Sequence, residues 1–334
     1  MIKAGPSRVL LIAVAFAAGV IAAVALLITQ PVWAGHRPRA TAPAVDPERL
    51  RQHVTALSVT FAPRDYTHVE NLGRAAAYIQ EQFRQAGADV SEQIFVADSQ
   101  HYRNIIARFG PKSREHGADS ELIVVGAHYD VCGPYPGADD NASGVAGLIE
   151  LAYLLGKQEL HTRVELVAYT LEEPPFFRSE QMGSAVHAES LLEKHVRLRA
   201  MLCLEMIGYF SDKPNSQQYP LAELKALYPN KGNFIALVGT FDDVGLLRRV
   251  KRAMIATNDL PLRSINAPRG LQGVDFSDHL NYWNCGFPAL MITDTAFYRN
   301  KRYHHPEDVI STLDFNRMAK VVEQVHAAVS ELER

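Results

Sequence analysis

Short apolar runs alternate with amphipathic stretches along most of the chain, and this alternation restricts the possible folds more than any other feature. The runs Ile123–Val125 and Val164–Tyr169 are nearly continuous in apolar residues, as expected of strands covered on both faces. We expect strands at Asn104–Phe109, Leu122–Ala127, Val164–Thr170, Leu198–Ile207, Phe234–Gly239 and Ala289–Thr293. We expect helices at Pro47–Phe61, Val69–Ala86, Ala142–Leu155, Gln181–His195, Asp242–Thr257 and Asp314–Leu332. Strands that alternate with helices predict an α/β sandwich around a mostly parallel or mixed sheet.

An uncharged run of apolar or small residues, Val9–Ile28, lies close to the amino terminus. As a helix that rises about 1.5 Å per residue, it would span about 30 Å, the hydrocarbon thickness of a bilayer. Lys3 and Arg8 precede the run, so we expect one N-terminal transmembrane helix whose amino end stays in the cytoplasm. Val32–Ala34 offers a small-residue cleavage site, so an uncleaved signal anchor and a cleaved signal peptide both fit.

The apolar run and the segment after it divide the chain into three expected parts. These are a membrane anchor or signal segment at 1–34, a linker rich in Pro and Ala at 35–46, and one folded domain at 47–334. The domain is expected outside the cytoplasm, either membrane-anchored (periplasmic in a bacterium) or secreted after cleavage. Cys132, Cys203 and Cys285 can oxidise there, although an odd number leaves at least one of them unpaired.

The composition excludes several classes of protein. With 47% hydrophobic and 21% charged residues, the chain can build a large core, which excludes intrinsic disorder and small disulfide scaffolds. Its 34 basic and 37 acidic residues give a formal net charge of −3, so no nucleic-acid partner is expected. The basic run Arg248–Arg252 is interpreted as the solvated face of a helix.

Polar residues collect where the expected strands end, which is where ligands bind in folds of this class. The strand Leu122–Ala127 runs into His128 and Asp130, whose spacing places both side chains on one side of an extended chain. The segment Pro136–Gly144 then carries consecutive acidic and amide residues before a helix. Helix capping explains one such residue, whereas crowded carboxylates favour a bound cation.

Further acidic residues and histidines occupy similar places. The strand Val164–Thr170 stops at Glu172 and Glu173, because the prolines that follow cannot continue a β ladder. Glu205 lies inside an apolar strand, where an acid needs a partner or a metal. A pair of histidines beginning with His304 follows the last expected strand. A solvated acidic strand end, a buried salt bridge and idle surface histidines are the alternative explanations. Taken together, carboxylates and imidazoles suit Zn²⁺, and a shared carboxylate suits two ions about 3.5–4 Å apart.

These motifs, in this order, resemble those of the di-zinc aminopeptidases. That family includes bacterial leucyl aminopeptidases and aminopeptidase Y, with glutaminyl cyclases and glutamate carboxypeptidase as relatives. The resemblance covers roughly Val69–Leu332 and rests on Gly126–Asp130, Pro136–Gly144, Glu172–Glu173, Glu205–Gly208, Ser277–His279 and Tyr303–His304. It implies a three-layer α/β/α sandwich with a central mixed sheet of about eight strands, as in phosphorylase/hydrolase-like proteins.

The resemblance implies a set of metal ligands. His128 and Glu205 would bind one zinc ion, Glu173 and His304 would bind the other, and Asp140 would bridge the two. Zn²⁺, two per chain, is therefore the expected cofactor.

The resemblance also implies catalytic roles. Glu172 would be the general base, and Asp130 would hold His128 in place. Tyr303 would either stabilise an oxyanion or serve in packing, and Ser277–His279 is interpreted as structural. The expected function is a zinc-dependent exopeptidase, an aminopeptidase that hydrolyses N-terminal residues of peptide substrates.

Two departures from the family pattern bear on this expectation. Position 205 is Glu where many members have Asp, and Pro174–Phe177 replaces a glycine-containing loop that can shape the specificity pocket.

Three other functions stay open. A glutaminyl cyclase-like acyltransferase would use one zinc ion with Asp140, Glu173 and His304. A carboxypeptidase-type relative would bind a free carboxylate, for which Tyr298–Arg302 offers cations unless it is a solvated loop. A non-enzymatic receptor would lack a bound metal.

Overall fold

A single mixed sheet forms the centre of the computed structural model, which describes residues 6–32, 43–111 and 121–334. The strands are β1 (Asp89–Ala97), β2 (Gln100–Phe109), β3 (Leu122–His128), β4 (Arg163–Tyr169), β5 (Leu198–Glu205), β6 (Ile235–Gly239), β7 (Leu262–Asn266) and β8 (Ala289–Thr293). They lie in the order β1-β2-β4-β3-β5-β8-β6-β7. The four central strands β4, β3, β5 and β8 run parallel, so their carboxyl ends lie at one edge of the sheet.

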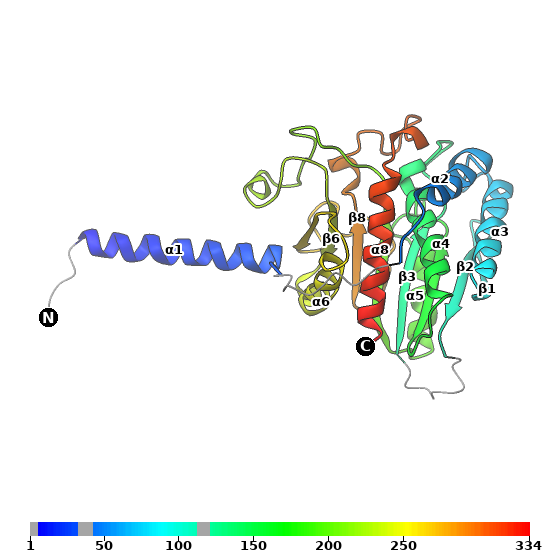
Figure 1. Ribbon diagram of the computed structural model, residues 1–334, viewed down its shortest axis with the longest axis horizontal. Helices are drawn as coiled ribbons and strands as arrows, with labels where there is room; N and C mark the ends of the chain where they lie inside the picture. The colour runs from blue at the N-terminus through cyan, green and yellow to red at the C-terminus, as the bar shows by residue number, and fades with distance from the viewer. Residues whose placement is uncertain (1–5, 33–42, 112–120) are drawn as a thin grey trace.

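Helices cover both faces of the sheet and complete a three-layer sandwich (Figure 1). The helices are α1 (Pro6–Thr29), α2 (Pro47–Thr55), α3 (Val69–Gln85), α4 (Gly144–Leu155), α5 (Gly183–Glu193), α6 (Val244–Ile255), α7 (His279–Asn284) and α8 (Phe315–Leu332). Buried side chains of α2, α3, α4, α6 and α8 share one core with one face of the sheet. Those of α5 and α7 share a second core with the other face. The predicted α/β/α fold class and the predicted number of strands are confirmed.

Most predicted elements are present with small shifts at their ends. The helix predicted at Pro47–Phe61 is α2 followed by a π-helical turn, Ala56–Thr60. The strand predicted to reach Ile207 ends at Glu205. Strands β1 and β7 and the short helix α7 were not predicted. β1 and β7 are the two edges of the sheet; the first half of β1 is mostly polar and β7 has five residues, so neither is a continuous apolar run like the central strands.

The apolar N-terminal run forms α1, which projects from the rest of the molecule (Figure 1). Leu10–Thr29 is long and apolar enough to cross a membrane, and none of it is buried against the protein. Part of the expected linker at 35–46, together with Trp33 and Ala34 of the expected cleavage site, lies outside the described residues.

The carboxyl end of α1 is held by a buried lysine on α6. Lys251 is only 7% exposed, and its Nζ donates to the carbonyl oxygens of Thr29 and Gln30, at 2.8 Å each. Ser264 of β7 also donates to the Thr29 carbonyl, at 2.8 Å. The interpretation of Arg248–Arg252 as a solvated face is therefore wrong for Lys251, because its ammonium caps carbonyl groups that a helix end leaves unpaired.

Candidate active site

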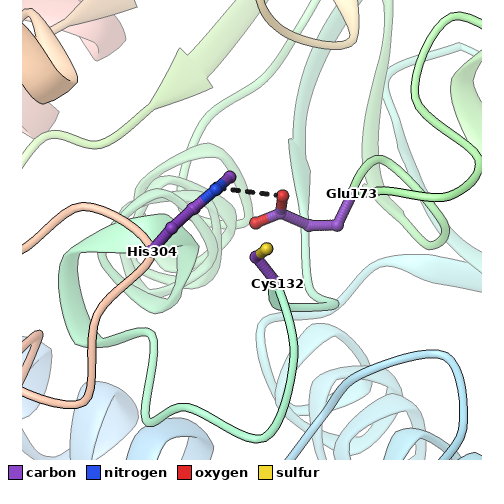
Figure 2. A group of neighbouring side chains, drawn as sticks. All are labelled: Cys132, Glu173 and His304. Atoms are coloured by element: carbon purple, nitrogen blue, oxygen red, sulfur yellow. Dashed lines mark ion pairs between the residues drawn. The ribbon is translucent and has the colours of Figure 1, made fainter.

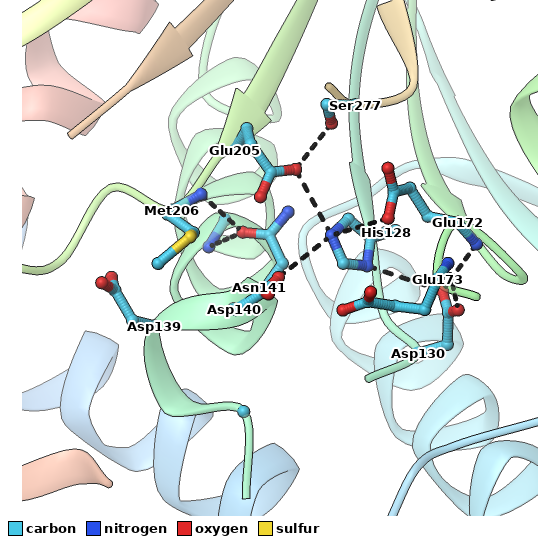
Figure 3. Close-up of polar contacts among 12 residues, drawn as sticks. His128, Asp130, Asp139, Asp140, Asn141, Glu172, Glu173, Glu205, Met206 and Ser277 are labelled. Atoms are coloured by element: carbon cyan, nitrogen blue, oxygen red, sulfur yellow. Dashed lines mark hydrogen bonds and ion pairs between the residues drawn. The ribbon is translucent and has the colours of Figure 1, made fainter. Parts of the chain in front are cut away.

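The predicted site residues come together at the carboxyl ends of the central strands (Figure 3). His128 is the last residue of β3, and Glu205 is the last residue of β5. Glu172 and Glu173 follow β4, and Asp140 lies in the irregular turn Ala138–Ser143 that leads into α4. The loop that follows β8 brings in His304, so segments far apart in the chain meet in one buried cluster.

Asp140 lies between the two imidazoles and presents one carboxylate oxygen to each. Its Oδ1 is 3.4 Å from Nε2 of His128, and its Oδ2 is 3.1 Å from Nε2 of His304. Oε2 of Glu205 lies 3.3 Å from the same His128 nitrogen, and Oε2 of Glu173 lies 3.1 Å from the same His304 nitrogen. The five side chains thus form two sets of donor atoms that share the Asp140 carboxylate.

Several of these donor atoms are buried without a hydrogen-bond partner. They include both ring nitrogens of His128, Oδ2 of Asp140, Oε1 of Glu173 and Nε2 of His304. A buried polar atom without a partner is costly, so their convergence indicates that a ligand completes the site. Imidazole nitrogens mixed with carboxylate oxygens are a donor set that suits Zn²⁺, so the residues present fit the metal that the sequence predicts.

The electrostatics of the cluster also favour a cation. Burial raises the pKa of Glu172 well above its ordinary value and raises the pKa of Glu173 to about 8. Burial also raises the pKa of Glu205. For His128, burial acts to lower the pKa, but the negative charges of Glu205 and Glu172 outweigh it and raise the pKa. The raised pKa values of these acids favour their protonated forms, whereas a divalent ion would favour their ionised forms.

Asp130 contacts both the residue that ends β3 and the residues that follow β4. Its two carboxylate oxygens accept the backbone N–H groups of Glu172 and Glu173, at 3.2 and 3.1 Å. One of them also lies 3.5 Å from Nδ1 of His128. Asp130 is therefore placed to orient the paired glutamates, in addition to the predicted effect on His128.

Ser277, interpreted from the sequence as structural, contacts the cluster directly. Its hydroxyl donates to Oε2 of Glu205 at 2.6 Å (Figure 3). The longer arm of Glu at this position is thus held by the Ser277 hydroxyl, which fixes where its carboxylate lies. The Ser277–His279 motif was noticed in the sequence, but nothing in its pattern identified this contact.

Two residues that the sequence did not single out hold the turn that carries Asp140. Both carboxylate oxygens of Asp308 accept the backbone N–H of Asp139, and one also accepts that of Asp140, at 3.0–3.1 Å. Arg64 is fully buried and donates to the backbone carbonyls of Tyr129, Pro136 and Gly137 among others. These contacts connect the loops after β3 to distant parts of the chain.

Tyr303 stacks on the adjacent imidazole. Its ring lies 3.7 Å from the ring of His304 at an interplanar angle of 19°. Burial raises the pKa of its phenol, so the group keeps its proton at neutral pH. Both predicted uses of Tyr303, packing and hydrogen-bond donation, are compatible with this place.

A pocket of about 830 Å³, open to solvent, adjoins the cluster, and Glu205 and Tyr303 line part of it. The rest of its wall is mainly apolar and aromatic, and includes Leu224, Val238, Met291, Phe276 and Phe297. The departure from the family pattern at Pro174–Phe177 lies near this wall, because Phe177 packs edge-on against Phe276 with ring centroids 5.7 Å apart.

The basic tract Tyr298–Arg302 is only partly solvated. Arg299 is buried and donates to Gln217 and to the carbonyl of Tyr209, so the interpretation of the whole tract as a solvated loop is wrong. Lys301 is exposed and bonds to the carbonyl of Phe297.

The fold and the cluster define a metal-dependent hydrolase, since two sets of nitrogen and oxygen donors meet at the ligand-binding edge of an α/β/α sheet. The family model described as peptidase family M28 matches residues 104–329. The chain belongs to peptidase family M28, and it is a metallo-exopeptidase.

Individual proteins are similar to this chain over different shares of its length. The uncharacterized protein YfbL of Escherichia coli (strain K12) is 49% identical over 308 residues, covering 90% of this chain and 92% of that protein. Leucine aminopeptidase 1 of Pyrenophora tritici-repentis is 26% identical over 65% of this chain, and the chain spans about half of its length, 53%.

Solved structures share the fold at low identity. BSAP, a zinc aminopeptidase from Bacillus subtilis, has a TM-score of 0.68 at 16% identity, covering 87% of this chain and 96% of that protein. The glutaminyl cyclase of Fimbriiglobus ruber has a TM-score of 0.65 at 18% identity, covering 89% of this chain and 99% of that protein.

Proposed function

We propose that this chain is a zinc-dependent aminopeptidase with two metal ions and with Glu172 as its general base. The observation that carries this proposal is the position of Asp140, whose two oxygens face two separate donor sets at 3.4 and 3.1 Å. His128 and Glu205 would complete one metal site, and Glu173 and His304 the other. The names of the similar proteins, leucine aminopeptidase and zinc aminopeptidase, support the same activity.

The chemistry follows from the positions of the chain's own groups. Zinc, when bound, polarises an amide carbonyl and lowers the pKa of bound water toward about 7. Glu172 lies beside the donor atoms, with Oε2 3.9 Å from Nε2 of His128, so it is placed to accept the proton of the attacking water. The same carboxyl returns this proton to the leaving amine. The phenol of Tyr303 keeps its own proton and can donate a hydrogen bond to the oxyanion.

The charge of the site favours a substrate with a free amino group over one with a free carboxylate. Five buried acids, Asp130, Asp140, Glu172, Glu173 and Glu205, surround the cluster. Among the described residues, these acids outnumber the one buried Arg or Lys that faces them, Arg64, so the residues of the chain favour an ammonium over a carboxylate. The carboxypeptidase alternative also loses support because Arg299 is buried and bonded within the protein.

The apolar pocket predicts the preferred substrates. We expect kcat/KM for leucyl and phenylalanyl amides to exceed that for the alanyl amide by about 10-fold or more, since large apolar side chains fill the pocket. Kinetics on a panel of aminoacyl amides, glutaminyl peptides and carboxyl-terminal substrates, run beside zinc analysis, measures this. A preference for substrates with a free carboxylate would contradict the aminopeptidase assignment.

A glutaminyl cyclase-like acyltransferase is the second candidate, because a glutaminyl cyclase shares the fold at a similar TM-score. One zinc ion per chain together with cyclisation of glutaminyl peptides would favour it. The wall of the pocket includes Gln217, Gln218 and Gln272 but is mainly apolar and aromatic, which favours a peptidase that takes large apolar side chains.

We propose that α1 is an uncleaved anchor that holds the remainder of the chain outside the cytoplasm, in the periplasm of a bacterium. The contacts of Lys251 support retention of this helix. If α1 were removed, the buried ammonium would keep Ser264 Oγ, at 2.8 Å, but would lose the carbonyls of Thr29 and Gln30. Leaving a buried charge short of partners is costly.

Mass spectrometry tests whether the mature protein retains α1. We expect the protein purified from the membrane fraction to retain its N-terminal segment, and to stay with the membranes after a high-salt wash. A soluble chain that begins after Ala34 would instead identify a cleaved signal peptide.

A further inference from the structure

Cys132 lies in the loop directly after β3 and reaches the edge of the donor cluster. Its sulfur, a carboxylate oxygen of Glu173 and a ring nitrogen of His304 lie within 4.8 Å of one another. Figure 2 shows the thiol beside the Glu173 carboxylate, facing the His304 ring. The other two cysteines, Cys203 and Cys285, belong to none of the donor groups found among the described residues, and all three cysteines are free.

Glu173 and His304, the two side chains beside this thiol, each have a buried atom that lacks a hydrogen-bond partner. Glu173 is only 3% exposed, and its Oε1 has no hydrogen-bond partner. Nε2 of His304 is also buried without one. A carboxylate oxygen and an imidazole nitrogen that converge in this way beside a thiol form a donor set of oxygen, nitrogen and sulfur, which suits zinc and softer ions.

We propose that Cys132 is a thiolate ligand of the metal ion held by Glu173 and His304. This inference rests on the proposed metal centre. It implies that the two metal-binding positions differ in chemistry, because one of them has a sulfur ligand. The position formed by His128 and Glu205 has only nitrogen and oxygen donors. Binding of the ion by Cys132 replaces the thiol proton, which passes to solvent. The sulfur-containing position should therefore hold thiophilic ions such as Cd²⁺ more tightly than the other position does.

The test uses the full-length chain with Cys285→Ser as a background that removes a second partly exposed thiol. The metal-free protein is loaded with Co²⁺, and its near-ultraviolet spectrum is recorded. We expect a sulfur-to-cobalt charge-transfer band that is absent in Cys132→Ala. X-ray absorption at the zinc edge should show a sulfur neighbour at about 2.3 Å. Cys132→Ala should lower Cd²⁺ affinity at one position by about 10-fold or more and leave the other position unchanged.

Thiol alkylation gives a measurement that needs no variant of Cys132. We expect zinc to slow the modification of Cys132 by about 10-fold or more relative to the metal-free protein, because a coordinated sulfur is not free to react. If the protein binds zinc and hydrolyses peptides, yet shows no metal–sulfur signal and equal alkylation with and without zinc, the inference about Cys132 is overturned and the proposed function stands. If no metal binds at all, both fail.

Discussion

Glu172→Gln is expected to lower kcat by about 10²- to 10⁴-fold while zinc stays bound. The amide keeps the size and shape of the side chain, but it cannot accept a proton from water at neutral pH. Glu172 is buried beside His128, at 3.9 Å from its ring nitrogen, and it is not one of the side chains proposed to bind metal. Steady-state kinetics on a leucyl amide, combined with zinc analysis of the same preparation, measures both effects.

Glu180→Gln is the matched control, because Glu180 is exposed on the same loop and contacts none of the donor atoms. It should leave both kcat and zinc content unchanged. If the Glu172→Gln protein bound zinc and kept full turnover, Glu172 would not be the general base.

Asp140→Ala should remove metal from both positions, since this one carboxylate faces both imidazoles. We expect zinc affinity to fall by more than about 100-fold, and peptidase activity to be lost with it. Zinc content after dialysis and kcat/KM measure the two effects. In the parent protein, a chelator should abolish activity and added zinc should restore it.

Asp242→Asn serves as the control for this variant, because Asp242 is an exposed acid that belongs to none of the donor groups found among the described residues. It should keep full zinc content. If Asp140→Ala kept full zinc content and lost activity alone, Asp140 would act on the substrate or the water and would not bridge two metals.

The sequence singled out the candidate site residues because they follow strong local patterns in the chain, and the fold brings them together. His128 and Glu205 end apolar strands, and Glu172 and Glu173 lie between the end of β4 and two consecutive prolines. The carboxyl ends of parallel strands meet at one edge of a sheet, so residues at those ends converge whatever separates them in the chain. The central strands were predicted for the same reason, because burial on both faces requires continuous apolar runs.

The residues that support the site could not be predicted in this way. Arg64 and Asp308 act by contacting backbone groups more than 60 positions away, and such contacts leave no local pattern. Nothing in the sequence around Ser277 indicates that its Oγ lies 2.6 Å from Oε2 of Glu205. Lys251 lies in a basic run that is typical of a solvated helix, and its contacts to the end of α1 and to Ser264 leave no local pattern. Tertiary contacts override local patterns at each of these positions.

The edges of the sheet were missed for a different physical reason. β1 pairs with one neighbour only and is mostly half-buried, so its sequence needs no continuous apolar run. β7 is five residues long and alternates buried with exposed positions. Short or half-solvated strands carry a weak periodic signal.

Anomalous diffraction at the zinc edge from crystals of the zinc-loaded protein tests the central claim most directly. We expect two peaks about 3.5–4 Å apart, one on each side of the Asp140 carboxylate, with His128 and Glu205 around one and Glu173 and His304 around the other. Zinc bound elsewhere, or no peak between His128 and His304, would contradict it.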